Sequence, residues 1–205
     1  MSAQGLKRVV LGVAVALSAA AVSAAQPPAP PKAAPLEGPA VAGVCLLSRE
    51  AVVAHAKVGM AASARIAQLA QQAQAEVDVQ RKPVDADIQK LRAQAASLKP
   101  DDRVKQEQAL AVRLQQVQQL NTQRSREIEV TREKATGRIA EMAQPVIANV
   151  YKSRGCGLLL DRNAVLGGNM SNDLTAAVVQ GLDASVTTIS FERENLPANG
   201  GQRSP

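Results

Sequence analysis

Apolar residues change their spacing along the chain, and each change predicts a new element. The run "VAGVCLL" (41–47) is almost continuously apolar and predicts a short buried β-strand. Ser48 follows as a fitting N-cap, with Glu50 in the first turn, where a negative charge favours the positive end of the helix dipole. From Ile66 onward the apolar positions recur in alternating steps of three and four, the spacing of a helix that packs along one face. We therefore expect one helix from Ser48 to about Leu98.

A second helix with the same spacing follows the sequence "LKPDD". Pro100 is expected to end the first helix, and Asp101 or Asp102 to cap the next one. Gly155 fits the C′ position that closes the second helix. Two long helices joined by a tight turn should fold back as an antiparallel hairpin, with arms on the order of 75 Å long.

The apolar positions of the two helices form a seam that should hold the hairpin together. Arg124 and Thr131 interrupt the seam, and alanines thin it, which favours a pliable arm over a rigid rod. Pro83 and Pro145 lie inside the helices and are either tolerated kinks or hinges. The seam consists of Ile66, Leu69, Val77, Val84, Ile88, Leu91, Leu98, Leu110, Leu114, Val117, Leu120, Ile128, Ile139 and Met142.

After the hairpin the pattern returns to short elements. "GLLLD" (157–161) predicts a buried strand, and "AVLGG" (164–168) its partner or an edge strand. Asp173 is expected to cap a short helix that ends near Gly181, and "VTTISFER" (186–193) alternates like a final strand. The predicted fold class is α+β, with a small β-rich body and a long helical hairpin inserted between its strands. The expected boundaries are 41–60 and 140–195 for the discontinuous body and 61–139 for the hairpin arm.

The start of the chain has the features of an export signal. Lys7 and Arg8 precede an apolar run that ends in small residues, so residues 1–25 are predicted to be a signal peptide cleaved near Ala24 or Ala25. We expect the mature protein to be exported. The other terminal segments are assigned as a proline-rich linker (26–40) and a disordered tail (196–205).

Composition predicts a small core and disfavours nucleic acid as a partner. Tyr151 and Phe191 are the aromatic residues and there is no Trp, so the core must be aliphatic, and stability through self-association is expected. The formal charge of +6 falls by two, to +4, without Lys7 and Arg8. The bases are interleaved with acids, as in "REIEVTREKATGR". This pattern is typical of a solvated helix face and disfavours a nucleic-acid-binding surface.

The residues that carry chemistry are few. His55 is the one histidine and has no partners at metal-ligand spacing, so we expect no metal site, no catalytic site and no cofactor. Cys45 lies in the first strand and Cys156 just before the second. In an exported protein a disulfide between them would close a loop of about 110 residues and contribute up to ~4–5 kcal/mol. Two buried thiols, or a redox or intermolecular role, are the alternatives.

The order of these elements resembles the Skp (OmpH-like) family of periplasmic chaperones. The segment "GCGLLLDRNAVL" after the hairpin is similar to the family's strand pair, and "DLT", leading to "VVQGLD", is similar to its following helix. The resemblance covers about residues 41–193. Cys156 stands where the family usually has Tyr, and the outer arms are near charge balance rather than strongly basic.

This resemblance implies a homotrimer in which three bodies join through their β-structure into a barrel-like hub. Three hairpins then surround a cavity that holds unfolded outer-membrane proteins without ATP, in the periplasm. The seam residues become candidates for contact with such a client, and anionic lipid or lipopolysaccharide is a further candidate partner. The alternative is a structural or tethering coiled-coil protein of the cell envelope, which predicts a tight, continuous seam of large apolar side chains.

Overall fold

The computed structural model describes residues 38–197 of the 205-residue chain. The expected signal peptide (1–25) lies outside the described residues, as do most of the expected linker (26–40) and tail (196–205). All described residues belong to one compact unit. In chain order its elements are β1 (Val44–Leu47), α1 (Arg49–His55), α2 (Lys57–Gln94), α3 (Pro100–Ser153), β2 (Leu158–Asp161), the short 3₁₀ helix η1 (Arg162–Ala164) and α4 (Thr175–Ser185).

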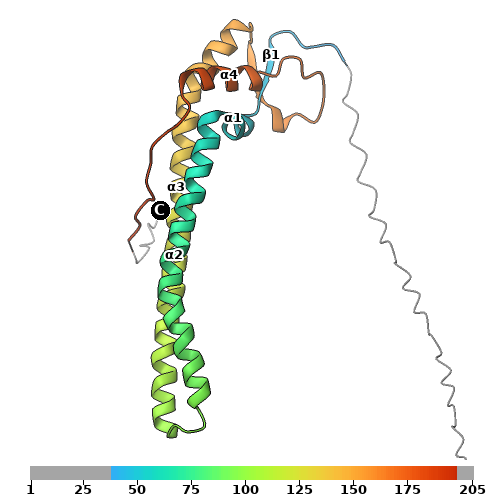
Figure 1. The fold of residues 1–205 in the computed structure, drawn as a ribbon. Helices are drawn as coiled ribbons and strands as arrows, with labels where there is room; N and C mark the ends of the chain where they lie inside the picture. The colour runs from blue at the N-terminus through green and yellow to red at the C-terminus, as the bar shows by residue number, and fades with distance from the viewer. Residues whose placement is uncertain (1–37, 198–205) are drawn as a thin grey trace, which may run out of the picture. The chain divides into compact units, whose positions relative to one another are not determined.

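The fold is α+β and mostly helical. Helices α2 and α3 lie side by side as an antiparallel hairpin, which projects from a body formed by the remaining elements (Figure 1). The sheet has two four-residue strands, so the described body contains less β-structure than the sequence led us to expect. No helix among residues 38–197 is long and apolar enough to cross a membrane.

The turn between α2 and α3 differs from the prediction in the role of its proline. Helix α2 already ends at Gln94, and Pro100 begins α3 instead of ending the first helix. Proline suits a first helical position because its missing N–H would have no partner there. At the far end of α3, Gly155 has a φ of 65° and the N–H groups of Gly155 and Cys156 bond back to Lys152 and Tyr151, which confirms the predicted C′ residue.

The predicted continuous helix from Ser48 is interrupted at Ala56. Ser48 caps α1 as expected, since its hydroxyl oxygen accepts from the Ala51 N–H. Ala56 is extended, with a ψ of 144°, and has no side chain able to cap α2. Instead the Asp183 carboxylate of α4 accepts from the N–H of Lys57 at 2.7 Å. The cap therefore comes from a residue 126 positions away, which local sequence spacing does not reveal.

Strand β1 is paired on both of its edges. It runs parallel to β2, with Val44 opposite Leu158 and Leu47 opposite Asp161. On its other edge, the Leu46 N–H donates to the Asn172 carbonyl, and the Leu46 carbonyl accepts from the Leu174 N–H. Residues 172–174, which precede α4, thus occupy the edge of β1 where a further strand would otherwise pair.

Two predicted strands are wrong. Residues 164–168 form the end of η1 and a loop in which Leu166 is fully exposed. Residues 186–193 are not part of the sheet, although their alternating pattern predicted a strand. This segment instead runs along the hairpin, where side chains satisfy its main-chain groups.

The core of the body joins all of its elements. Buried residues from β1, α1, α2, α3 and α4 form one apolar cluster, against which Phe191 and Tyr151 also pack. A disulfide joins Cys45 of β1 to Cys156, with their Cα atoms 5.8 Å apart. The bridge ties the beginning of the hairpin to its end.

Candidate functional site

The predicted seam is divided between the interior of the hairpin and its rim. Seven of its side chains are buried, Ile139 among them as part of the body core: Ile66, Leu69, Val77, Val84, Leu91, Val117 and Ile139. Seven are half-buried: Ile88, Leu98, Leu110, Leu114, Leu120, Ile128 and Met142. The buried set holds the helices together and is not accessible to a client, so contact with a client stays a prediction for the half-buried set alone.

The lower hairpin, which we define as residues 77–120, has a thin apolar contact. Val77, Val84 and Val117 are its buried cluster, and leucines that are only half-buried surround it. Hollows of about 230 Å³ beside Pro83 and about 300 Å³ beside Leu91 open between the two helices. The lower arm therefore has little apolar packing to hold it in one geometry.

The upper hairpin is covered by a third segment. Residues 186–197, here called the strap, leave α4 and run along the hairpin toward its middle (Figure 1). Near the start of the strap, Val186, Ile189 and Phe191 pack against the body core. Its later residues lie over a polar section of the seam that includes Glu127 and Thr131, exposed by only 1% and 2%.

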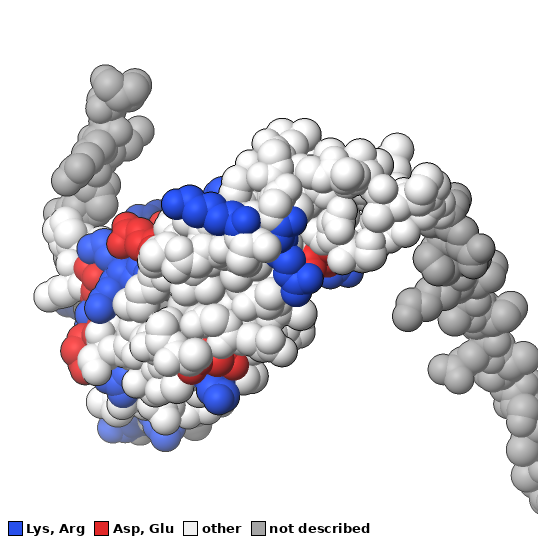
Figure 2. All heavy atoms as spheres, turned by 90° about the horizontal axis from the view of Figure 1, so that it is seen from above, with Lys and Arg blue, Asp and Glu red and all other residues white. Residues whose placement is uncertain are grey.

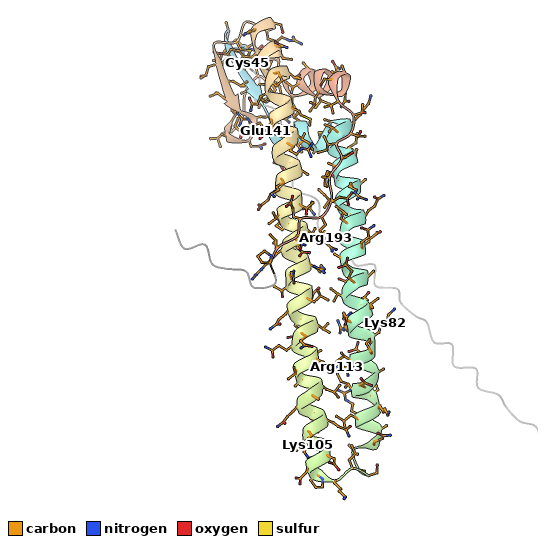
Figure 3. The ribbon with its side chains drawn as sticks, turned by 90° about the vertical axis from the view of Figure 1, so that its left-hand side faces the viewer. Cys45, Lys82, Lys105, Arg113, Glu141 and Arg193 are labelled. Atoms are coloured by element: carbon orange, nitrogen blue, oxygen red, sulfur yellow. A yellow bond between two sulfur atoms is a disulfide. The ribbon has the colours of Figure 1, made fainter. Side chains whose placement is uncertain are left out.

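Four charged side chains meet beneath the strap, and we call them the charge cluster. Arg124 of α3 donates to Glu76 of α2 at 2.6 Å and to Glu127, one turn further along α3, at 2.8 Å. Arg193 of the strap donates to Glu76 at 2.9 Å and approaches Glu127 at 3.3 Å. Figure 3 places Arg193 between the two helices of the hairpin. Two guanidinium groups and two carboxylates thus join three segments of the chain.

The charge cluster shifts the pKa of two of its members. The hydrogen bond from Arg193 is the largest influence on Glu76, and with Arg124 it outweighs partial burial and lowers the pKa of the Glu76 carboxyl. Burial alone would lower the pKa of Arg124, but the bonds and charges of Glu127 and Glu76 outweigh it and raise that pKa. Glu76 and Arg124 are therefore ionised at neutral pH.

The body exposes apolar side chains around its small sheet. On β2, Leu158 is 51% exposed and Leu160 38% exposed, and Leu166 and Val41 are more exposed still. Figure 2, which looks down on this end, shows a largely uncharged face with acidic and basic side chains in small mixed groups. An apolar surface of this kind beside a short edge strand such as β2 is typical of a contact between protein chains.

Comparison with known proteins identifies the family to which this chain belongs. The model of a family described as outer membrane protein (OmpH-like) matches residues 43–182, from the first strand into α4. The chain belongs to the OmpH-like family. A solved structure from Caulobacter crescentus CB15, described as a candidate outer membrane chaperone (OmpH-like), is 35% identical with a TM-score of 0.68. That likeness covers 78% of this chain and 94% of the Caulobacter chain. No curated protein matches the chain.

The other predicted positions of this OmpH-like chain are readily located. Pro83 and Pro145 lie inside α2 and α3, which both continue through them, so their role as hinges stays a prediction. His55 is the last residue of α1. Within residues 38–197 there is no group of three or more His, Cys, Asp or Glu side chains arranged to hold a metal ion.

Sequence reasoning missed the charge cluster and the strap. Arg124 and Thr131 were interpreted as interruptions that make the arm pliable. In the structure Arg124 donates to Glu76 of α2, and the Thr131 hydroxyl oxygen accepts from the strap. A signal was present, because Arg124, Glu127 and Thr131 follow one another in steps of three and four. A polar stripe at the seam's own spacing indicates a polar partner for that face of the helix.

Proposed function

We propose that this protein is an ATP-independent holdase chaperone of the periplasm, which binds unfolded outer-membrane proteins between the helical arms of a homotrimer and prevents their aggregation. One observation carries the proposal: a long hairpin with a thin lower seam projects from a body whose small sheet leaves apolar side chains exposed. The description of the Caulobacter structure as a candidate outer membrane chaperone supports the same conclusion.

The exposed sheet supports self-association. A two-stranded sheet is marginal in water by itself, and β2 combines four-residue length with exposed Leu158 and Leu160. Further copies of the body would extend the sheet and cover these side chains. Three bodies assembled in this way would set three hairpins around a common space.

The lower arms suit a client that must stay mobile. Their half-buried leucines and open hollows offer shallow apolar contacts, worth ~25 cal/mol for each Å² covered. The cost of ordering an unfolded client offsets much of that gain, so each contact is weak, and three linked arms supply avidity. A client that folds into a membrane buries its apolar surface better than the arms do, and this drives release.

Suppression of aggregation tests the chaperone function directly. A urea-unfolded β-barrel protein is diluted into buffer with the purified protein at stoichiometric amounts, and light scattering is followed. We expect the scattering to fall to near the level of a soluble control. Unchanged scattering, with the arms intact by circular dichroism, would favour a structural or tethering protein of the envelope instead.

Assembly is tested separately with a matched pair of variants. Leu160→Glu places a charge on the exposed face of β2, whereas Val104→Glu makes the same change on an exposed position near the hairpin tip. We expect the native mass of Leu160→Glu to fall to that of a monomer and that of Val104→Glu to stay trimeric. The melting temperature of the unmodified protein should also rise with protein concentration.

A further inference from the structure

The hairpin holds the strap through the strap's main chain as well as through its side chains. Five hydrogen bonds join hairpin side chains to main-chain atoms of the strap. In three of them a hairpin side chain donates to a strap carbonyl: Arg138 to Ser190, Arg65 to Phe191 and Gln123 to Leu196. In the other two a strap N–H donates to a hairpin side chain: Glu194 to the Thr131 hydroxyl oxygen and Leu196 to the Glu127 carboxylate. Because any extended chain offers these groups, these five contacts do not depend on one sequence.

Ion pairs add a charge pattern to this main-chain binding. Glu192 pairs with Arg65 at 2.8 Å and Glu194 with Lys134 at 2.7 Å, while Arg193 between them enters the charge cluster. The hairpin thus presents acidic groups in the groove and basic groups along its margins. A segment with a basic side chain pointing inward fits this pattern.

The strap does not fill the groove. A hollow of about 360 Å³ remains beside the charge cluster, between the strap and the helices, and Leu69 and Gln72 form part of its wall. The strap lies beyond residue 182, the last residue of the OmpH-like match.

We propose that the groove formed by Arg65, Glu76, Gln123, Glu127, Thr131 and Arg138 is a docking track for an extended polypeptide segment, and that the strap is its resident occupant, which an unfolded client displaces. This inference rests on the proposed chaperone function and names one binding surface for it. Unfolded chains expose the free main-chain N–H and C=O groups that the track binds, and folded proteins have already paired most of theirs.

Tethering makes the strap an effective competitor even if it binds weakly. A segment joined to its site by a short connection acts at a local concentration of about 1 mM. A strap with an intrinsic dissociation constant of about 0.1 mM would then weaken client binding at the track about tenfold. Only a client that offers several segments, bound at several arms, would open the track efficiently.

The decisive experiment uses a fluorescent peptide with the sequence of residues 186–197 and a chain that ends at Ser185, checked for folding by circular dichroism. Anisotropy should show saturable binding to the shortened chain and at least about tenfold weaker binding to the full chain, whose track is occupied. A peptide carrying Arg193→Ala should bind about tenfold more weakly, because it leaves both carboxylates of the cluster with one guanidinium. A urea-unfolded β-barrel protein should displace the bound peptide, and the same protein folded in detergent should not.

A second variant tests the proposal in the full chain, where the apolar anchor of the strap stays in the body. Arg193→Ala should raise affinity for the unfolded client several-fold, up to the about tenfold masking estimated above. Arg132→Ala removes an exposed base that is paired with Glu129 on the outer face of α3 and should leave that affinity unchanged.

The outcomes separate this proposal from the chaperone function. Absence of peptide binding to a folded shortened chain would overturn the docking track, as would peptide that no unfolded client displaces. In the full chain, an Arg193→Ala variant that binds the unfolded client no more tightly than the unmodified protein would overturn it as well. If aggregation is still suppressed in either case, the chaperone function stands and the strap is a brace. If peptide binds and is displaced by unfolded protein but aggregation is not suppressed, the track stands and the holdase function fails.

Discussion

The upper and lower parts of the hairpin are built from the same two helices but are held together in different ways. In the lower hairpin a few valines and half-buried leucines meet across two helices. In the upper hairpin the strap adds a third segment, and Glu127 and Thr131 are buried beneath it. The third layer lets polar side chains be buried with every partner they need, which two helices alone do not provide.

This difference assigns stability and mobility to separate lengths of one arm. Contacts in the upper part are directional and numerous, so they fix the angle at which the hairpin leaves the body. The lower part depends on thin apolar packing, which tolerates sliding and bending at small cost. The proposed holdase function requires an arm with a firm root and a pliable end, and this division is consistent with both.

Removing Glu127 should have the largest effect on the upper hairpin. Glu127→Ala leaves Arg124 and Arg193 with Glu76 as their shared acidic partner, and frees the Leu196 N–H. Loss of one partner from a buried ionic group is strongly destabilising, and the partial exposure of both arginines reduces the expected cost to about 2–3 kcal/mol. Urea unfolding at fixed protein concentration measures it, with hydrogen exchange to locate the change in the strap.

Glu129→Ala is the matched control, because it removes the same side chain two positions along α3, where it is 65% exposed. We expect it to change the free energy of unfolding by less than about 0.5 kcal/mol. Equal effects of the two substitutions would show that the upper hairpin does not depend on the charge cluster.

Shortening Leu91 should loosen the lower hairpin without releasing the strap. Leu91 is 8% exposed and borders the larger apolar hollow with Leu110 and Leu114. Leu91→Ala should cost about 2 kcal/mol, at the low end for such substitutions, because the site is already partly open. Hydrogen exchange should speed up between residues 84 and 120 and stay slow in the strap. Faster exchange along the whole arm would mean that the two parts unfold as one unit.

Restoring a helix bond at Pro83 should have a smaller effect, in the opposite direction. Pro83 has no N–H to donate to the preceding turn and lies beside one of the hollows. Pro83→Ala should stabilise the lower arm by about 1 kcal/mol, since α2 already continues through the proline and part of its cost is accommodated. The same comparison tests its role as a hinge: if Pro83→Ala leaves both exchange and client binding unchanged, the proline is a tolerated kink.

The sequence predicted the parts of this fold that depend on local periodicity. The seam spacing, Ser48 and Gly155 specify the two long helices and their outer ends, because each signal acts within a turn or two of its own position. The break at Ala56 escaped prediction because its cap, Asp183, lies on another helix. The strap was mistaken for a strand because alternation indicates an extended chain but does not indicate which element will bind it.

The site was the least predictable part, since its two halves lie far apart in sequence. Arg193 and Glu76 are 117 positions apart, and neither belongs to a recognisable motif. The polar stripe on α3 indicated that something polar covers the seam there, but the identity of that partner required the fold. Diffuse polypeptide binding leaves no fixed residue pattern, so it is visible only when the main chain of an occupant is in place.

Acidification should release the strap before it unfolds the hairpin. Glu76 has a lowered pKa because Arg193 and Arg124 donate to it, so its folded-state pKa lies below the usual 4.5. The stability that comes from this group is fully present above pH 4.5 and is lost as the pH falls through the folded-state pKa. We expect exchange protection of the strap to be constant from neutral pH down to about 5 and to fall at lower pH.

Glu76→Gln isolates this contribution from the other acids around the same hollow, which are Glu127, Glu192 and Glu194. The glutamine amide does not gain or lose a proton in this pH range, so the part of the pH dependence that belongs to Glu76 should disappear. Glu129→Gln, on the exposed face of α3, should keep the original profile. If Glu76→Gln also keeps it, the strap is held chiefly through its main chain and its apolar anchor. The upper hairpin would then differ from the lower one in its third layer and not in its buried charges.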